Sequence, residues 1–428
     1  MNKIFVGIVF FAFIFAGFQQ ISSVQNLSEP SPMELLSTAM VDSAGSAVDL
    51  AIGLVGVMTL FLGLMKVVEE GGMLAILSKL IRPLMVRLFP DVPPDHPAMG
   101  AMILNLSANA LGLGNAATPF GIKAMQALDT LNPNKGTATN AMALFLAINT
   151  SSVTLLPTGV IALRAAAGSV DPAAILPTTL FATIGSTFVA IGAARLFQRF
   201  SKGGDSGEID IQTASLAQQE SDISPAKDAA YPFWVSLLAL AGLGSIIPVA
   251  VLFGASFSPW ILPTLMVGFL LFGLVRGVKV YEVFVEGAKE GFQVALRIIP
   301  YMVAILVAVG MLRASGGLGL IVNLLGHVTV HFGLPAEALP MALMRPLSGS
   351  GAYGIMAAII NDPAIGPDSY TGLLVSTLQG STETSFYVMA VYCGAAGIRR
   401  VRHSLAAALT ADLAGVIFAV LACSLFLV

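Results

Sequence analysis

Charged residues are scarce in this chain. Asp, Glu, Lys and Arg make up 11% of its 428 residues, whereas soluble domains carry roughly a quarter. Hydrophobic residues account for 56%, and the mean hydropathy is +0.86. So little charge excludes an ordinary soluble protein and predicts an all-α, polytopic membrane protein.

Other absences narrow the function. The two cysteines, Cys393 and Cys423, lie in apolar segments, which excludes a disulfide framework and a zinc site. The net charge of −3 and the lack of a basic, aromatic-rich patch exclude nucleic acid as a partner. Without a Gly-Lys-Ser/Thr phosphate-binding loop, the chain cannot drive a pump by nucleotide hydrolysis. We expect no enzyme, cofactor or bound metal.

The most unusual stretch is Asn105-Leu-Ser-Ala-Asn-Ala-Leu-Gly-Leu-Gly-Asn-Ala-Ala-Thr-Pro119, inside a strongly apolar region. Its amides, hydroxyls, glycines and proline weaken a helix and expose backbone groups. At membrane depth this is tolerated only where the backbone lines a cavity or is covered by protein. The stretch therefore predicts a broken membrane helix. Residues 345–352, Arg-Pro-Leu-Ser-Gly-Ser-Gly-Ala, predict a second one, and paired interrupted segments point to a transporter's binding site.

One long polar tract, residues 201–230, predicts a flexible cytoplasmic linker between two halves, 1–200 and 231–428. The halves repeat each other weakly. A span at 47–72 ending in Glu-Glu-Gly-Gly resembles one at 292–317 ending in Arg-Ala-Ser-Gly-Gly. The Lys and Arg distribution gives these spans opposite orientations, which predicts two inverted gate-type repeats with broken or re-entrant helices.

The rest of the pattern predicts further helices. Residues 4–18 predict a retained first helix, with a cleaved signal peptide as the alternative. Residues 21–41 are polar and expected outside the membrane, and 71–89 form an amphipathic helix that leads into a re-entrant hairpin. Spans are expected at 47–65, 138–162, 176–197, 233–253 and 259–275. The positive charges place the N-terminus, the linker and residues 399–402 in the cytoplasm, so the expected location is a bacterial plasma membrane.

Polar side chains in the apolar segments are the candidate solute-binding residues. In the first half they are Asn105, Ser107, Asn109, Asn115, Thr118, Asn149, Thr150 and Ser151. In the second half they are Ser348, Ser350, Gln379, Ser381, Thr382, Glu383 and Thr384. These neutral donors and acceptors, with one carboxylate, suit a small polar solute or an ion. The alternative is that small residues mediate close helix packing.

Glu383 is the sharpest single candidate. A carboxylate within an apolar span is costly and is by default a functional hypothesis, either as a cation ligand or as a proton-exchanging group. The alternative is a structural hydrogen bond to nearby hydroxyls. Arg345 could bind an anion, but a structural cap or snorkelling is favoured.

These motifs resemble a known family. The stretch 105–125 resembles spore maturation protein A, whereas 345–352, 366–369 and 376–387 resemble spore maturation protein B. The chain is similar to a fusion of the two through the linker. The family is similar to the gate domains of concentrative nucleoside transporters and of the ferrous-iron transporter B, a fold-level likeness. It implies a role in dehydrating and maturing the spore core where spores form.

Two functional classes stay open. The favoured one is a secondary transporter or gated permease with its pathway between the repeats. The other is a membrane scaffold or solute sensor without transport. Expected partners are the lipid bilayer and a small polar solute or ion, and a homo-oligomer is left open.

Overall fold

The computed structural model describes residues 2–22, 30–201, 231–317, 319–320 and 329–426. Within these ranges every regular element is a helix, and a single isolated bridge joins Thr137 to Arg400. The all-α prediction is confirmed. Nearly all of the predicted linker, residues 202–230, lies outside the described residues.

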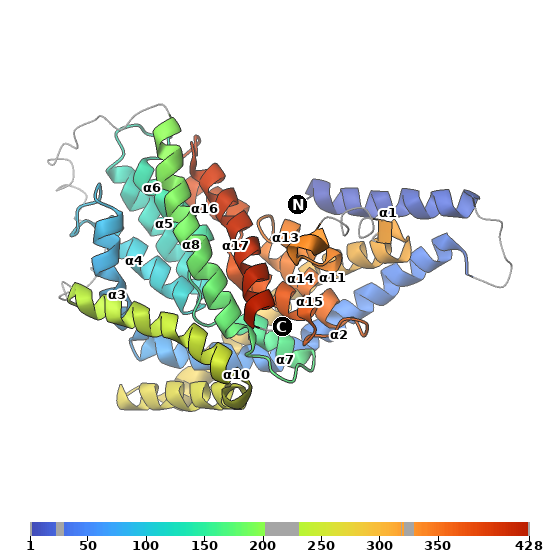
Figure 1. The fold of residues 1–428 in the computed structure, drawn as a ribbon, viewed down its shortest axis with the longest axis horizontal. Coiled ribbons are helices and arrows are strands. Elements are labelled where there is room, and N and C mark those ends of the chain that lie inside the picture. The colour runs from blue at the N-terminus through green and yellow to red at the C-terminus, as the bar shows by residue number, and fades with distance from the viewer. Residues whose placement is uncertain (1, 23–29, 202–230, 318, 321–328, 427–428) are drawn as a thin grey trace.

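The described residues of the first half form eight helices, which Figure 1 labels. They are α1 (Asn2–Ser22), α2 (Pro32–Glu70), α3 (Met73–Leu88), α4 (Pro97–Ala110), α5 (Gly114–Thr130), α6 (Asn140–Thr150), α7 (Thr158–Ala166) and α8 (Ile175–Phe200).

The second half follows the linker. Its described helices are α10 (Phe233–Val275), α11 (Val280–Ala314), η2 (Val330–Phe332), η3 (Ala336–Ala338), α13 (Leu339–Met344), α14 (Gly349–Ile360), α15 (Tyr370–Ser381), α16 (Ser385–Ala395) and α17 (Ser404–Phe426).

Three helices in the described part of the chain are long and apolar enough to cross a membrane: α8, α17 and the segment Phe5–Ser22 of α1. At 1.5 Å per residue, the 23 and 26 residues of α17 and α8 exceed the roughly 30 Å thickness of a bilayer core. The chain is therefore a helical membrane protein.

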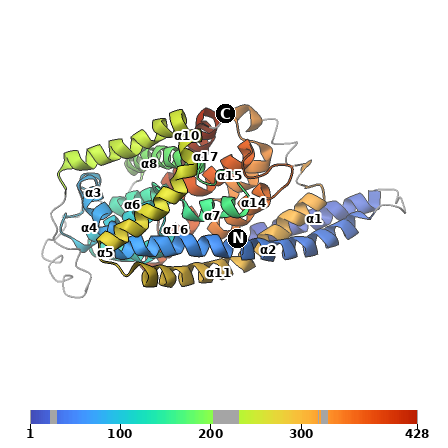
Figure 2. The same ribbon diagram turned by 90° about the horizontal axis from the view of Figure 1, so that it is seen from below.

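Two long helices in the first half each pack against a helix of the second half in the opposite direction. On α2 and α11, Gly287 lies against Leu62, whereas Gly310 lies against Ser43, so the residue numbers run in opposite senses. On α8 and α17, the Ser186 hydroxyl donates to the Ala411 carbonyl at 2.8 Å, and Phe181 packs edge-on against Phe426. Figure 1 shows both pairs, and Figure 2 shows α2 beside α11.

Some predicted bounds need correction. The span expected at 47–65 lies inside the longer helix α2, which already begins at Pro32 within the stretch expected to be polar. The span expected at 292–317 overlaps α11, which begins earlier, at Val280, and ends at Ala314. The pair expected at 233–253 and 259–275 is one helix, α10, which changes direction along its length (Figure 2). The small residues between the expected spans weaken a helix without ending it, so a bend replaces the turn.

Two arginines join the halves. Arg164, at the end of α7, reaches Asp368 at 2.9 Å and the Pro367 carbonyl at 2.6 Å in the loop before α15. Arg402, just before α17, reaches the Ala138 carbonyl and the Asn140 Oδ1 at 3.1 Å each, at the start of α6. Each half thus supplies an arginine that bonds to a loop or helix start of the other half. These contacts fix the position of α7 relative to α15 and of α17 relative to α6.

Candidate functional site

Four breaks between consecutive helices fall in the stretches that the sequence singled out. The breaks are residues 111–113 between α4 and α5, 151–157 between α6 and α7, 345–348 between α13 and α14, and 382–384 between α15 and α16. Gly112 has a φ of 76°, which favours glycine, and a side chain there would collide with the Leu156 carbonyl. The Leu155 N–H donates to the Ala110 carbonyl at 2.9 Å. The first two breaks therefore touch each other.

The sequence pattern predicted two of these breaks and missed the other two. The clusters around Asn149 and Glu383 were expected in the middle of continuous spans, which is wrong because α6 ends at Thr150 and α15 ends at Ser381. The hydroxyls of Thr150 and Ser151 bond back to the Ala147 carbonyl at 2.9 and 3.0 Å. Such local bonds compete with the helical ladder.

A cavity of about 420 Å³ lies where all four breaks meet. The first half contributes Asn109, Gly112, Leu113, Thr154, Leu156, Pro157, Thr158, Gly159 and Val160, with Met58, Leu62, Met65, Lys66 and Glu69 of α2. The second half contributes Glu290, Arg345, Gly349, Ser350, Tyr353, Gln379, Gly380, Glu383 and Thr384. Its volume falls in the range of small-molecule sites, roughly 300 to 1,000 Å³.

Five charged side chains line this cavity. Lys66 and Arg345 are cationic, and Glu69, Glu290 and Glu383 are anionic. The Lys66 Nζ lies 3.4 Å from the Glu69 Oε2. Sequence reasoning did not include Lys66, Glu69 and Glu290 among the candidate binding residues. Lys66 was used only to assign the orientation of its membrane span. The position of all three inside long apolar helices is the signal that could have found them.

Arg345 organises the second-half side of the cavity. It is 7% exposed and donates to the Thr382 carbonyl and, at 3.1 Å, to the Thr384 Oγ1. The Glu383 Oε2 lies 3.7 Å from its Nη2, and the Glu383 N–H donates to the Thr150 carbonyl at 2.7 Å. The Glu383 side chain is 42% exposed, so it is a cavity-facing carboxylate and not the buried one expected from sequence.

The predicted residues divide into two groups. Asn109, Ser350, Gln379, Glu383 and Thr384 line the cavity. The others that can be placed do not line it, and most make structural hydrogen bonds. Asn149 donates to Asn105, which donates to the Tyr392 hydroxyl at 3.1 Å, all within the core.

The second group also includes several capping and packing contacts. Ser107 accepts from Ser78 at 3.2 Å, and the Ser348 hydroxyl accepts from the Gly351 N–H at the start of α14. Ser381 bonds to its own helix, and Thr382 offers only its carbonyl, to Arg345. Thr118 is half-buried on α5, and the Asn115 side chain lies outside the described residues.

Three buried atoms on cavity residues have no hydrogen-bond partner in the described structure. They are the Asn109 Nδ2, the Gln379 Oε1 and the Arg345 Nε. A buried polar atom without a partner costs about 1–3 kcal/mol. Two N–H groups and one oxygen on residues of the cavity wall are therefore without a partner in this part of the structure.

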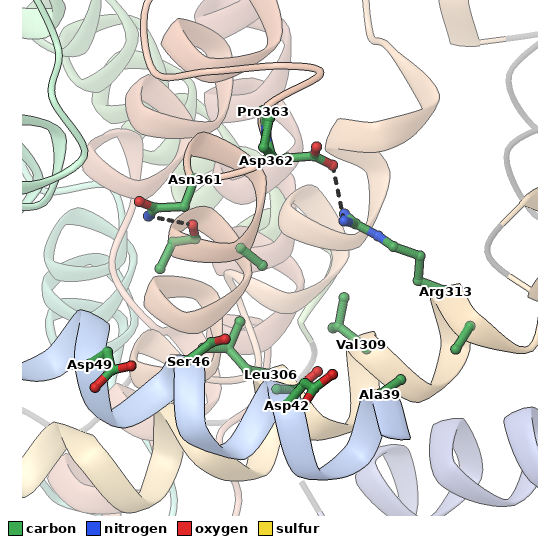
Figure 3. A pocket seen from close by; sticks show the side chains of 15 residues that line it. Ala39, Asp42, Ser46, Asp49, Leu306, Val309, Arg313, Asn361, Asp362 and Pro363 are labelled. Atoms are coloured by element: carbon green, nitrogen blue, oxygen red, sulfur yellow. Dashed lines mark hydrogen bonds and ion pairs between the residues drawn. The ribbon is translucent and has the colours of Figure 1, made fainter. Parts of the chain in front are cut away.

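A second cavity, of about 600 Å³, lies between α2, α11 and the end of α14 (Figure 3). Asp42, Ser46 and Asp49 line one side of it, and Arg313 crosses it to Asp362 at 3.0 Å. None of the residues predicted from sequence lies here.

A helical membrane protein with a charged, partly unsatisfied cavity between interrupted helices is the class that the geometry defines. The chain belongs to the Gate family, described as nucleoside recognition, whose model matches residues 51–167 and 295–399, more than half of the chain. The two matched segments contain all four helix breaks.

Two relatives in Bacillus subtilis (strain 168) are similar to parts of this chain. Spore maturation protein A is 47% identical over 170 residues, which are 39% of this chain and 87% of the relative. Spore maturation protein B is 45% identical over 160 residues, which are 37% of this chain and 89% of the relative. These matches confirm the resemblance to a fusion of the two. No solved structure matches the chain.

Proposed function

We propose that this chain is a multi-pass protein of the bacterial plasma membrane that passes a small polar or ionic solute through the 420 Å³ cavity. One observation carries the proposal: all four helix breaks line the same cavity. Breaks at membrane depth expose backbone and helix ends, which is tolerated when they line a solute path.

The lining supports a solute with polar groups of both kinds. Lys66 and Arg345 offer partners to an anionic group, whereas Glu69, Glu290 and Glu383 offer partners to a cationic one or to hydroxyls. The family description makes nucleosides the first solutes to test. Of the fifteen residues predicted from sequence, five line this proposed binding site.

Alternating access requires two related halves, and we propose that residues 1–200 and 231–428 are inverted repeats joined by the linker. The antiparallel pairing of α2 with α11 and of α8 with α17 supports this arrangement, because a two-fold axis in the membrane plane pairs equivalent helices in opposite directions. The exchange of Arg164 and Arg402 between the halves supports it further.

The names of the two relatives suggest the setting, and we propose that transport by this chain serves spore maturation. Expression of the full chain in a Bacillus subtilis strain that lacks both relatives should restore the heat resistance of its spores. A strain that carries the chain in its membrane but stays heat-sensitive argues against this role.

The transport proposal is tested with the purified full chain in sealed vesicles. Uptake of labelled solutes, nucleosides first, is compared for the wild type and Gln379→Ala, with Gln126→Ala as the control. Gln379 lines the cavity, whereas Gln126 donates only to the Ala395 carbonyl at an exposed position. We expect uptake to fall several-fold in the first variant and to stay unchanged in the second.

Two results would count against transport. Solute binding without uptake by the wild type would favour the sensor or scaffold alternative. Equal uptake by both variants would mean that the path lies elsewhere.

A further inference from the structure

Asp412 is a buried acid that sequence reasoning overlooked. It lies in the middle of α17, one of the three helices able to cross a membrane, and is 5% exposed. Its Oδ2 accepts a hydrogen bond from the Ser385 hydroxyl at 2.7 Å, and its Oδ1 has no partner in the described structure. A carboxylate can accept about four hydrogen bonds, so a single donor leaves most of the hydrogen-bonding capacity of Asp412 unused.

The elements packed around Asp412 supply no cation that bonds to it. Next to it, the Ala411 carbonyl accepts from Ser186 of α8, and Gly415, one turn further, packs on Thr382. The ionisable side chains on the packed helices are Arg195 and Arg199 on α8, Tyr370 on α15, Tyr387, Tyr392 and Cys393 on α16, and Cys423 on α17, with His403 just before α17. In the described structure none of these forms a hydrogen bond or ion pair with Asp412.

A short chain of contacts connects Asp412 to the cavity. Ser385, its donor, follows directly after Thr384, which lines the cavity and accepts from the Arg345 Nη1 at 3.1 Å. The Arg345 Nε is buried and has no hydrogen-bond partner among the described residues. Arg345 is therefore linked to two acids, to Glu383 by the 3.7 Å contact and to Asp412 through Thr384 and the adjacent Ser385.

Arg345 forms no close ion pair with either acid in the described structure. Its distance of 3.7 Å from the Glu383 carboxylate is longer than a charge-assisted hydrogen bond of about 2.8 Å. An unpaired carboxylate inside a membrane helix is costly, so its charge must be removed by a proton or balanced by a cation. When Asp412 is protonated and neutral, Arg345 interacts with Glu383 alone. When Asp412 is ionised, its negative charge attracts Arg345 away from the cavity.

We propose that Asp412 binds and releases the proton that couples solute movement to a proton gradient, with Arg345 exchanging between Glu383 and Asp412. The proposal rests on the proposed transport function. In the step itself, a hydronium ion in the cavity gives up a proton and is left as water; the proton reaches the Asp412 carboxylate by way of the Ser385 hydroxyl, its hydrogen-bond donor, and makes it a carboxylic acid. Release reverses the same path, so no other reactant is needed. Because Arg345 also holds the 382–384 break, its exchange moves the cavity wall.

Asp412 has a competing, purely structural role, which is to tie α17 to the first residue of α16 through Ser385. Asp412→Asn keeps the shape and the acceptor for Ser385 but cannot exchange a proton. The matched control is Asp95→Asn, the same change at a side chain that is 96% exposed. Glu383→Gln removes the other acid near Arg345.

Proton binding is measured without transport by infrared difference spectroscopy of the full chain in vesicles, titrated with acid. We expect a carboxylic-acid band that rises on acidification in the wild type, in Asp95→Asn and in Glu383→Gln, and that is lost in Asp412→Asn. An unchanged band in folded Asp412→Asn overturns the proposal. If Asp412→Asn does not fold, Asp412→Glu provides the second reading, because a proton-binding acid moves the band and a structural tie does not.

Coupling is measured separately as solute uptake with and without an imposed pH difference. We expect the pH difference to raise uptake by the wild type and Asp95→Asn, and Asp412→Asn to lose this response while it still exchanges solute at equal pH. If uptake by the wild type is the same with and without the pH difference, the proposed coupling to protons is refuted, whereas the proposed transport is not. If no solute moves at all, transport fails, and the infrared result still decides whether Asp412 binds a proton.

Discussion

Arg164 is the side chain whose loss we expect to cost the most stability. It is 0% exposed, and its guanidinium donates to the Asp368 Oδ1 at 2.9 Å, to the Pro367 and Asp171 carbonyls at 2.6 and 3.1 Å, and to the Ser169 hydroxyl at 3.0 Å. Arg164→Ala removes this cation and its contacts between α7 and the loop before α15, and leaves Asp368 only the Ser169 hydroxyl at 2.5 Å and the Val170 N–H at 2.8 Å as donors.

The magnitude follows from these contacts. Removing one partner of a buried ion pair costs about 3–5 kcal/mol. The Asp368 side chain is 39% exposed and regains some water, so we expect the lower end, about 3 kcal/mol. Arg402→Ala should cost less, about 1–2 kcal/mol, because Arg402 donates to neutral oxygens and is only part-buried.

The assay is denaturant unfolding of the full chain in mild detergent, with Arg399→Ala as the control at an exposed arginine. A surface change of this kind is expected within about 0.5 kcal/mol of the wild type. If Arg164→Ala unfolds at the same denaturant concentration as the control, the arginine contacts do not hold the halves together. The argument for their structural role then fails.

Three further predictions follow from the site and the helix packing. Glu383→Gln should lower solute uptake several-fold without changing the unfolding midpoint, because the side chain is 42% exposed; equal uptake by variant and wild type would remove Glu383 from the solute path. Cysteines placed at the exposed positions Arg400 and Ala364 should react with an impermeant reagent from opposite sides of the membrane, Arg400 from the cytoplasm, and labelling of both from one side would refute the topology. Gly310→Val should separate α2 from α11, since even a Cβ collides with the Ser43 hydroxyl, and should cost about 1–3 kcal/mol in the same unfolding assay; an unchanged midpoint would show that the contact adapts freely.

Local chemistry explains which parts of the fold could be predicted. The break near Gly112 follows from glycines and a proline in an apolar run, and α3 follows from an amphipathic pattern. The breaks at Ser151 and Thr382 were missed because hydroxyl residues are compatible with both helix and break. Whether they end a helix depends on partners such as the contact between the Glu383 N–H and the Thr150 carbonyl.

Side-chain roles were harder to predict than helix breaks. Asn105 and Asn149 have the same chemistry as Asn109, yet they bond to each other in the core whereas Asn109 faces the cavity. A polar residue in an apolar helix indicates that it needs a partner, but not whether that partner is protein or solute.

The sequence by itself determined that the protein is helical and membrane-embedded, and that the helices weaken near Gly112 and Arg345. Hydropathy, glycine and proline act locally, so they can be read along the chain. Only the tertiary structure decided that four breaks share one cavity, that Lys66, Glu69 and Glu290 join it, and that Asp412 is buried behind it. These depend on antiparallel packing between residues far apart in sequence, such as α2 on α11, and no local pattern sets which faces meet.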